Sequence, residues 1–182
     1  MPDTPALLAV ARNQYIISLV KDSLCFLTPE GFRACEIKCL SEKKLGFIAR
    51  KNHASALKLV EKHSTSPSIE ICVVDAGDDY QGLFEFVLPA RQQGYRGIIV
   101  VYGKEFSQCN DYEFDEGSQA VSAGADWCVA NQNYMTPRFL SLAIYQAAVM
   151  NKRVRQNKGY SGVKLLGESG YFSSSLLQKS KN

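Results

Sequence analysis

IEICVVDAGDDY, residues 69–80, joins a run of apolar residues directly to a group of carboxylates. The four residues before the first aspartate, Ile71–Val74, are all apolar, and such a consecutive run is typical of a strand covered on both faces of its sheet. Asp75 follows the run at once, and an Ala-Gly pair separates it from Asp78 and Asp79. The stretch therefore predicts a buried parallel strand over 69–75 with an acidic loop at its carboxyl end.

Four other segments are predicted to be strands. Three are short apolar runs, and in the fourth, FRACEIKCL, apolar residues alternate with charged ones. The four segments cover 5–11, 32–40, 97–103 and 126–130. KLGFIAR, residues 44–50, is compatible with a further short strand or with a loop, and both interpretations stay open at this point.

Amphipathic segments lie between the strands. Their apolar residues recur with helical spacing. The predicted helices cover 15–27, 53–63, 80–94, 116–124 and 137–158. Asn52 and Asp79 are predicted caps of the second and third of these helices. Pro89 lies inside the third helix and is expected to shorten or kink it, because proline lacks the N–H that a helix interior needs.

Strands and helices alternate along the chain, which implies a parallel sheet with helices on both faces. Five strands suit the flavodoxin-like order 2-1-3-4-5, so the predicted fold class is an α/β three-layer sandwich of this type. One domain is expected over residues 1–158. Residues 159–182, rich in glycine and serine, are expected to form a tail that is flexible or docks on a partner.

The composition limits the classes of function. The chain has 182 residues, 46% of them hydrophobic, and a net charge of +3, which suits one domain with a real core and does not by itself imply nucleic acid. The six cysteines form no CxxC pair, so reduced thiols in a cytoplasmic protein are expected. His53 and His63 lack the paired cysteines of zinc sites, and no metal or cofactor is expected. The N-terminus has no signal-peptide pattern, and no apolar run approaches the roughly 18 residues of a membrane span.

Two longer stretches carry a resemblance to a known family. VVDAGDDYQGLFEFVLPARQQGYRGIIVVYG at 73–103 and AVSAGADWCVANQNY at 120–134, with the amphipathic helix after them, resemble the receiver domain of two-component response regulators. The resemblance covers roughly residues 5–156. It implies that Asp75 corresponds to the phosphoryl-accepting aspartate. In that family an acidic pair after strand one helps to hold Mg²⁺, and a hydroxyl residue after strand four and a lysine after strand five bind the phosphoryl group.

Several positions depart from that family's pattern. Ala11 and Arg12, followed by Asn13, stand in place of the acidic pair. Tyr102 stands where the hydroxyl residue would be, and Ala130 where the lysine would be. Mg²⁺ requires several oxygen ligands, so one retained aspartate beside an arginine makes a poor magnesium site. The resemblance therefore implies an atypical receiver, or pseudo-receiver.

The retained aspartate has two expected roles. Asp75 either forms a charge-assisted ion pair with Arg12 that replaces the metal charge, or bonds to the turn that follows it. Asp78 and Asp79 are expected to cap the next helix rather than to bind metal. Tyr102 is expected to be a fixed plug in the vacated pocket, with a mobile aromatic switch as the alternative.

The predicted function is a non-enzymatic signalling module that acts through protein contacts and is not phosphorylated by the usual magnesium-dependent route. The resemblance implies a working surface, and a route to homodimers, on the face of the fourth helix, fifth strand and fifth helix. Trp127, Tyr134 and Tyr145 are the aromatic interface candidates. A phosphorylatable receiver using Asp75 is the first alternative, and a small α/β enzyme or flavin binder is the second. The basic end of the last helix is expected to be solvated rather than bound to nucleic acid.

Overall fold

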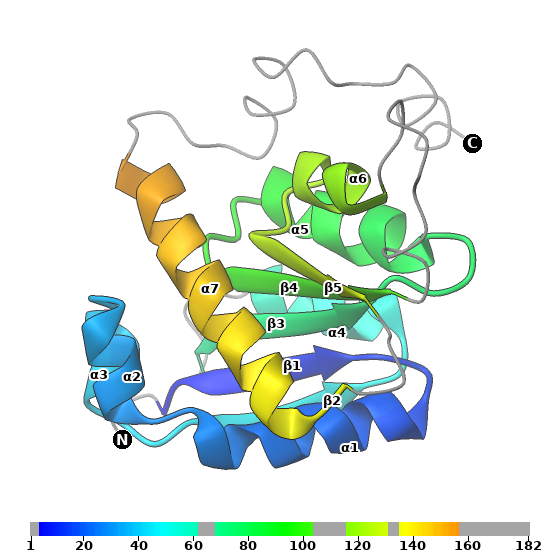
Figure 1. The fold of residues 1–182 in the computed structure, drawn as a ribbon. Coiled ribbons are helices and arrows are strands. Elements are labelled where there is room, and N and C mark those ends of the chain that lie inside the picture. Colours follow the sequence, from blue (N-terminus) through cyan, green and yellow to red (C-terminus); the bar gives the residue numbers. More distant parts are fainter. Residues whose placement is uncertain (1–3, 62–67, 104–115, 131–134, 157–182) are drawn as a thin grey trace.

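The computed structural model describes residues 4–61, 68–103, 116–130 and 135–156. They contain one parallel sheet of five strands in the order β2-β1-β3-β4-β5 (Figure 1). The strands are β1 (Ala6–Val10), β2 (Gly46–Arg50), β3 (Ile69–Asp75), β4 (Ile98–Gly103) and β5 (Trp127–Ala130). The predicted flavodoxin-like order and fold class are thereby confirmed.

Helices cover both faces of this sheet (Figure 1). One face carries α1 (Gln14–Ser23) and α7 (Pro137–Gln156). The other face carries α4 (His53–Glu61), the π-helical turn η2 (Leu83–Val87), α5 (Leu88–Gln92) and α6 (Glu116–Ser122). Each face has its own hydrophobic core, so the molecule has the predicted three layers.

The central strand β3 contributes to both cores. Ile71 and Val73 pack against the α1 and α7 face, whereas Cys72 and Val74 pack against the opposite helices. All four side chains are buried. Burying a side chain of this size stabilises the fold by roughly 1.5–3 kcal/mol. The consecutive apolar residues are therefore explained by the two helical layers, and β3 has the predicted bounds.

The predicted strand over 32–40 is wrong, because this region is helical. It contains α2 (Pro29–Ala34) and α3 (Lys38–Ser41). The second strand, β2, lies in residues 44–50, the segment that was compatible with either a strand or a loop. Thr28 caps α2, where its Oγ1 accepts the N–H of Gly31 at 3.1 Å. The residues between α1 and β2 thus form a two-helix insertion.

The insertion is held to the core by an aromatic contact. Phe32 of α2 is buried, and its ring centroid lies 5.0 Å from that of Tyr145 in α7. The Tyr145 hydroxyl accepts the N–H of Thr28 at 2.7 Å and donates to the carbonyl oxygen of Phe26 at 3.1 Å. Tyr145 therefore packs between α7 and the insertion, and its interface role stays a prediction.

Pro89 distorts the third predicted helix without ending it. The helix widens into the π turn η2, in which the N–H of Leu88 bonds to the carbonyl oxygen of Leu83, and continues as α5. A proline removes one helical hydrogen bond and crowds the carbonyl four residues earlier, which accounts for a wider turn just before it. The described residues show no hydrogen bond from the Asp79 carboxylate into this helix, so its predicted capping role is not observed.

Other predicted helix starts are confirmed. Asn52 caps α4, where its Oδ1 accepts the N–H of Ser55 at 3.0 Å. Thr136 caps α7 by accepting the N–H of Phe139 at 3.2 Å. None of the helices in the described ranges is both long and apolar enough to cross a membrane. The predicted tail over 159–182 lies outside the described residues.

Candidate functional site

The residues at the carboxyl ends of β1, β3 and β4 surround a cavity of about 360 Å³. This edge of the sheet is where the alternating topology predicts a site. The cavity is lined by Arg12, Asn13, Tyr15, Ile16, His53, Asp75, Gly77, Asp78, Asp79, Gln81 and Tyr102. Four of the site positions expected from the sequence are therefore brought together here, namely Arg12, Asn13, Asp75 and Tyr102.

Asp75 is bonded to the turn that follows it. Its Oδ1 accepts the N–H of Gly77 at 3.1 Å. Gly77 has a φ of +74°, a left-handed conformation that favours glycine. In the same loop, the N–H of Ala76 donates a hydrogen bond to the carbonyl oxygen of Tyr102 at 2.8 Å. The predicted role of Asp75 in its own turn is thus confirmed.

The loop after β1 offers no carboxylate to this cavity. Ala11 is buried, and Asn13 caps α1, where its Oδ1 accepts the N–H of Tyr15 at 2.9 Å. Arg12 is exposed. The close contacts between basic and acidic side chains among the described residues are His53–Glu85 and Arg91–Asp126. The predicted ion pair between Arg12 and Asp75 is therefore not observed, although both residues line the cavity.

Tyr102 forms the floor of the site. It is paired with Asp75 in the register of β3 and β4, and its side chain is only 1% exposed. Burial, followed by the neighbouring Tyr15 and Asp75, raises the pKa of Tyr102 to about 12. A buried aromatic ring in this position is in keeping with the predicted plug.

The raised pKa of Tyr102 predicts a loss of stability at alkaline pH. In an unfolded chain a tyrosine loses its proton near about pH 10, whereas folded Tyr102 keeps its proton to about 12. Between these values the unfolded state binds fewer protons, so the free energy of unfolding falls as pH rises. Tyr102→Phe should make this fall shallower by up to about 1.4 kcal/mol per pH unit. Urea denaturation of the native chain and the variant between pH 7 and about 12 measures the free energy of unfolding. The difference at neutral pH gives the effect of the substitution on packing alone. If the two free energies fell in parallel as the pH rose, the prediction would be contradicted.

His53 is the first residue of α4, and its side chain lies in the wall of the cavity. It is buried at the start of α4, and its Nδ1 lies 2.7 Å from Oε2 of Glu85 in η2. The two residues are 32 positions apart in the chain. No local pattern in the sequence marks this pair, because the contact depends on how α4 packs against η2.

The site contains several carboxylates but no metal cluster. Asp78 and Asp79 line the cavity with Asp75. Within the described ranges, no three His, Cys, Asp or Glu side chains lie close enough together to hold a metal ion. The chemistry that this edge of the sheet displays is therefore hydrogen bonding and charge.

The edge strand β5 presents the remaining predicted positions. Ala130 is its last residue and pairs in register with Gly103, whereas Tyr134 lies outside the described residues. Trp127 is 36% exposed and, with Phe139 and Leu142 of α7, lines a pocket of about 410 Å³. This apolar surface of β5 and α7 is called the β5–α7 patch.

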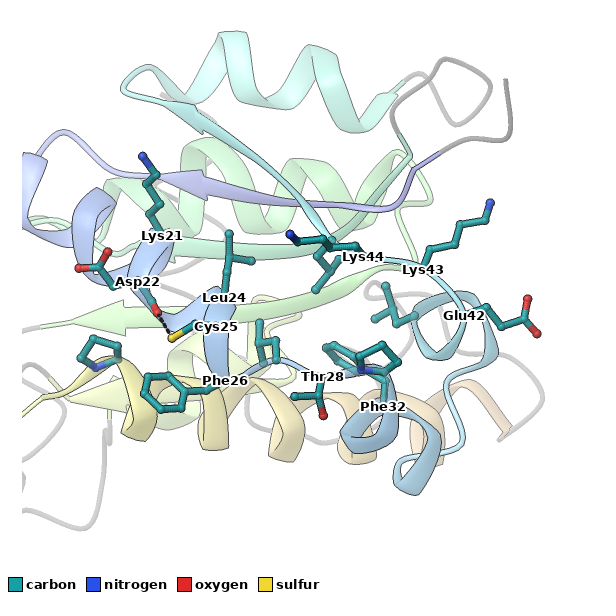
Figure 2. Close-up of a pocket in the computed structure, with 15 residues that line it drawn as sticks. Lys21, Asp22, Leu24, Cys25, Phe26, Thr28, Phe32, Glu42, Lys43 and Lys44 are labelled. Atoms are coloured by element: carbon teal, nitrogen blue, oxygen red, sulfur yellow. Dashed lines mark hydrogen bonds between the residues drawn. The ribbon is translucent and has the colours of Figure 1, made fainter.

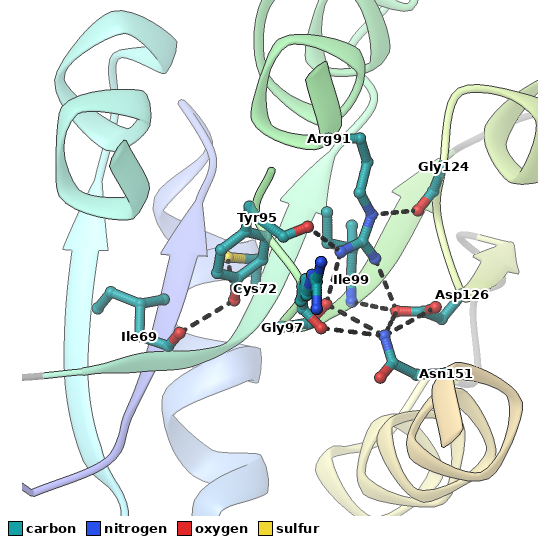
Figure 3. A network of polar contacts seen from close by, with 10 residues as sticks. Ile69, Cys72, Arg91, Tyr95, Gly97, Ile99, Gly124, Asp126 and Asn151 are labelled. Atoms are coloured by element: carbon teal, nitrogen blue, oxygen red, sulfur yellow. Dashed lines mark hydrogen bonds and ion pairs between the residues drawn. The ribbon is translucent and has the colours of Figure 1, made fainter. Parts of the chain in front are cut away.

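A buried polar network lies at the opposite, amino-terminal edge of β4 and β5 (Figure 3). Arg91 of α5 and Asp126, just before β5, form an ion pair at 2.9 Å, with side chains only 1% and 2% exposed. Arg91 also donates to the carbonyl oxygens of Tyr95, Gly97 and Gly124, each at 2.8 Å. No local pattern in the sequence marks this network, because Arg91 and Asp126 are 35 positions apart.

Comparison with models of known protein families and with curated proteins finds no match to this chain.

Proposed function

We propose that this chain is a non-enzymatic signalling module of the pseudo-receiver type, which acts through protein contacts. The observation that carries the proposal is the environment of Asp75. This aspartate ends the third strand of a five-stranded 2-1-3-4-5 sheet, as the acceptor does in the resembled family, but its Oδ1 is bonded to Gly77 and the loop after β1 offers no acid. The module thus retains an acceptor position without the usual metal-binding partners.

The residues at the β1 end of the cavity oppose the usual magnesium chemistry. Mg²⁺ prefers several oxygen ligands in near-octahedral geometry. At the β1 end the cavity offers the guanidinium of Arg12 and an amide, Asn13, whose oxygen already caps α1. Magnesium-dependent phosphoryl transfer needs the cation to neutralise the developing charge. A cation beside Arg12 would be repelled, so the transfer is disfavoured.

Incubation with acetyl phosphate and MgCl₂, followed by intact-mass measurement, tests the proposal directly. We expect the mass of the chain to stay unchanged. A gain of one phosphoryl group that is lost in Asp75→Asn would contradict the proposal. That outcome would support the alternative function, a phosphorylatable receiver with a rearranged site.

A gain-of-function variant tests the reason for the missing chemistry. Arg12→Asp replaces a cation by a carboxylate at an exposed position, where folding should tolerate the change. We expect this variant to bind Mg²⁺ measurably in calorimetry and the native chain not to do so. Arg12→Ala is the matched control, because it removes the positive charge without adding a ligand. Equal Mg²⁺ binding by the native chain and both variants would contradict the argument.

The β5–α7 patch supports the protein-contact part of the proposal. Its three large apolar side chains, Trp127, Phe139 and Leu142, are 36%, 51% and 59% exposed. Exposed apolar clusters of this kind are typical of interaction surfaces. A second copy of the chain is the partner to test first, by sedimentation over a range of concentrations. Leu142→Glu should abolish any dimer, and a dimer that survives this change would place the interface elsewhere.

A further inference from the structure

The helical insertion between α1 and β2 helps to enclose a second cavity, of about 960 Å³ (Figure 2). Its walls come from the end of α1, the 3-10 turn η1 (Leu24–Phe26), α2, α3 and the residues before β2. It shares no lining residue with the cavity at Asp75. Pockets for small molecules typically measure about 300–1,000 Å³, so this space is large enough for a ligand.

The floor of this cavity is apolar. Leu27, Phe32 and Leu40 are buried members of the core on the α1 and α7 face, and Leu24 and Leu45 pack against them. These five residues line the cavity. A ligand with an apolar body would therefore extend the existing core instead of contacting polar groups.

The charged residues of the cavity lie at its rim. Figure 2 shows Lys21, Lys43 and Lys44 along one side, opposite the aromatic rings. The carboxylates of Asp22 and Glu42 also belong to the lining, but in this view they point outward on either side. The three lysines outnumber the two acids. Lysine stems can cover an apolar surface while their ammonium groups reach an anion at its edge.

We propose that this cavity binds a small amphiphile that has an apolar body and one anionic head, such as a medium-chain carboxylate. The body would lie on the leucine and phenylalanine floor, and the head would lie at the rim near Lys21 and Lys44. This site is independent of the function proposed for Asp75. It belongs to the insertion, in the part of the chain that the receiver resemblance describes least well.

Calorimetry with dodecanoate below its critical micelle concentration tests the binding. We expect one saturable site, and binding of dodecyltrimethylammonium that is at least about tenfold weaker, because that probe has the same tail and the opposite charge. Equal affinity for the two probes would overturn the proposal, since it would mean that the rim charges make no difference.

Alkylation by iodoacetamide locates the ligand. Cys25 lines the cavity and is exposed, whereas Cys39 is exposed but is not part of the lining. Dodecanoate should slow the modification of Cys25 and leave that of Cys39 unchanged, as measured by peptide mass spectrometry. A Cys25→Trp variant tests the same location by calorimetry, because it has no thiol at this position to alkylate. The added ring should fill the cavity and abolish dodecanoate binding. Unchanged alkylation of Cys25 at saturating dodecanoate would place the ligand elsewhere.

Lysine variants separate the charge at the rim from the charge of the whole molecule. Lys44→Met should weaken dodecanoate binding about fivefold, the size expected for one partly solvated ion pair. Lys58→Met is the matched control, because Lys58 is an exposed lysine on α4, on the opposite face of the sheet. The proposal fails if both variants bind dodecanoate as the native chain does, or if both lose the same affinity.

Discussion

Asp126→Asn is expected to lower the free energy of unfolding by about 3 kcal/mol or more. The side chains of Asp126 and Arg91 are almost completely buried. The variant removes the negative charge that faces this guanidinium in a low-dielectric interior. Breaking a buried ion pair by changing one partner is expected to cost more than losing an exposed contact of the same kind.

The hydrogen bonds of Asp126 add to the expected effect. Its Oδ2 accepts the N–H of Ile99 at 2.8 Å and Nδ2 of Asn151 at 3.0 Å, in addition to the arginine (Figure 3). These contacts join β4, the start of β5 and α7 at one point. Losing charge-assisted bonds at such a junction weakens the packing of α7 on the sheet.

Urea denaturation of the native chain and the variant measures the effect. Asp22→Asn is the matched control, because Asp22 is an exposed aspartate in α1, and its substitution should change the free energy by less than about 0.5 kcal/mol. The double variant Arg91→Met/Asp126→Leu should recover part of the loss, since neither buried charge remains. Equal unfolding midpoints for the native chain and Asp126→Asn would refute the argument.

The fold could be predicted because the central strands carry an unambiguous pattern. β1, β3 and β4 are buried on both faces, so nearly every position must be apolar. The edge strand β2 is different, because all five of its residues are only partly buried. Its sequence therefore needs no continuous apolar run, and the alternating residues of 32–40 looked more like a strand than 44–50 did.

The local contacts of the candidate site were also predictable from the sequence. The bond between Asp75 and Gly77 spans two residues and follows from the turn chemistry of aspartate. The pairs His53–Glu85 and Arg91–Asp126 span 32 and 35 residues. Such pairs depend on helix packing that no short pattern encodes.

Two contacts of predicted site residues depend on packing that the sequence does not show. Tyr145 was predicted at an interface, but the insertion covers it, and its hydroxyl bonds to Thr28. Arg12 was expected to reach Asp75, but the aspartate bonds within its own turn and the arginine is exposed. The partner of Tyr145 depends on how the insertion packs against α7, whereas Asp75 takes the other of its two expected roles.

Gly82→Val is expected to cost about 3 kcal/mol, at the upper end of the range for overpacked sites. Gly82 lies directly before the π turn η2 and has a φ of −58°, which any residue can adopt, so its conformation does not require glycine. The space around its Cα atom, however, has no room for a side chain. A Cβ atom on Gly82 would collide with the carbonyl oxygen of Asp75 and lie 3.1 Å from Cα of Ala76. These are backbone atoms at the centre of the candidate site, and they cannot move aside as a flexible side chain can.

For Gly82→Ala, the sign of the change in the free energy of unfolding shows whether the Cβ atom collides. In an unobstructed helix, Gly82→Ala would stabilise the chain by about 1 kcal/mol, because alanine has the higher helix propensity. We expect destabilisation instead, and a shift of the Gly77 amide resonance in NMR spectra, because that amide donates to Asp75. Gln81→Val is the control for adding a β-branched residue to the same turn without the collision. A stabilised Gly82→Ala variant with an unshifted Gly77 resonance would show that the helix does not hold the Asp75 loop in place.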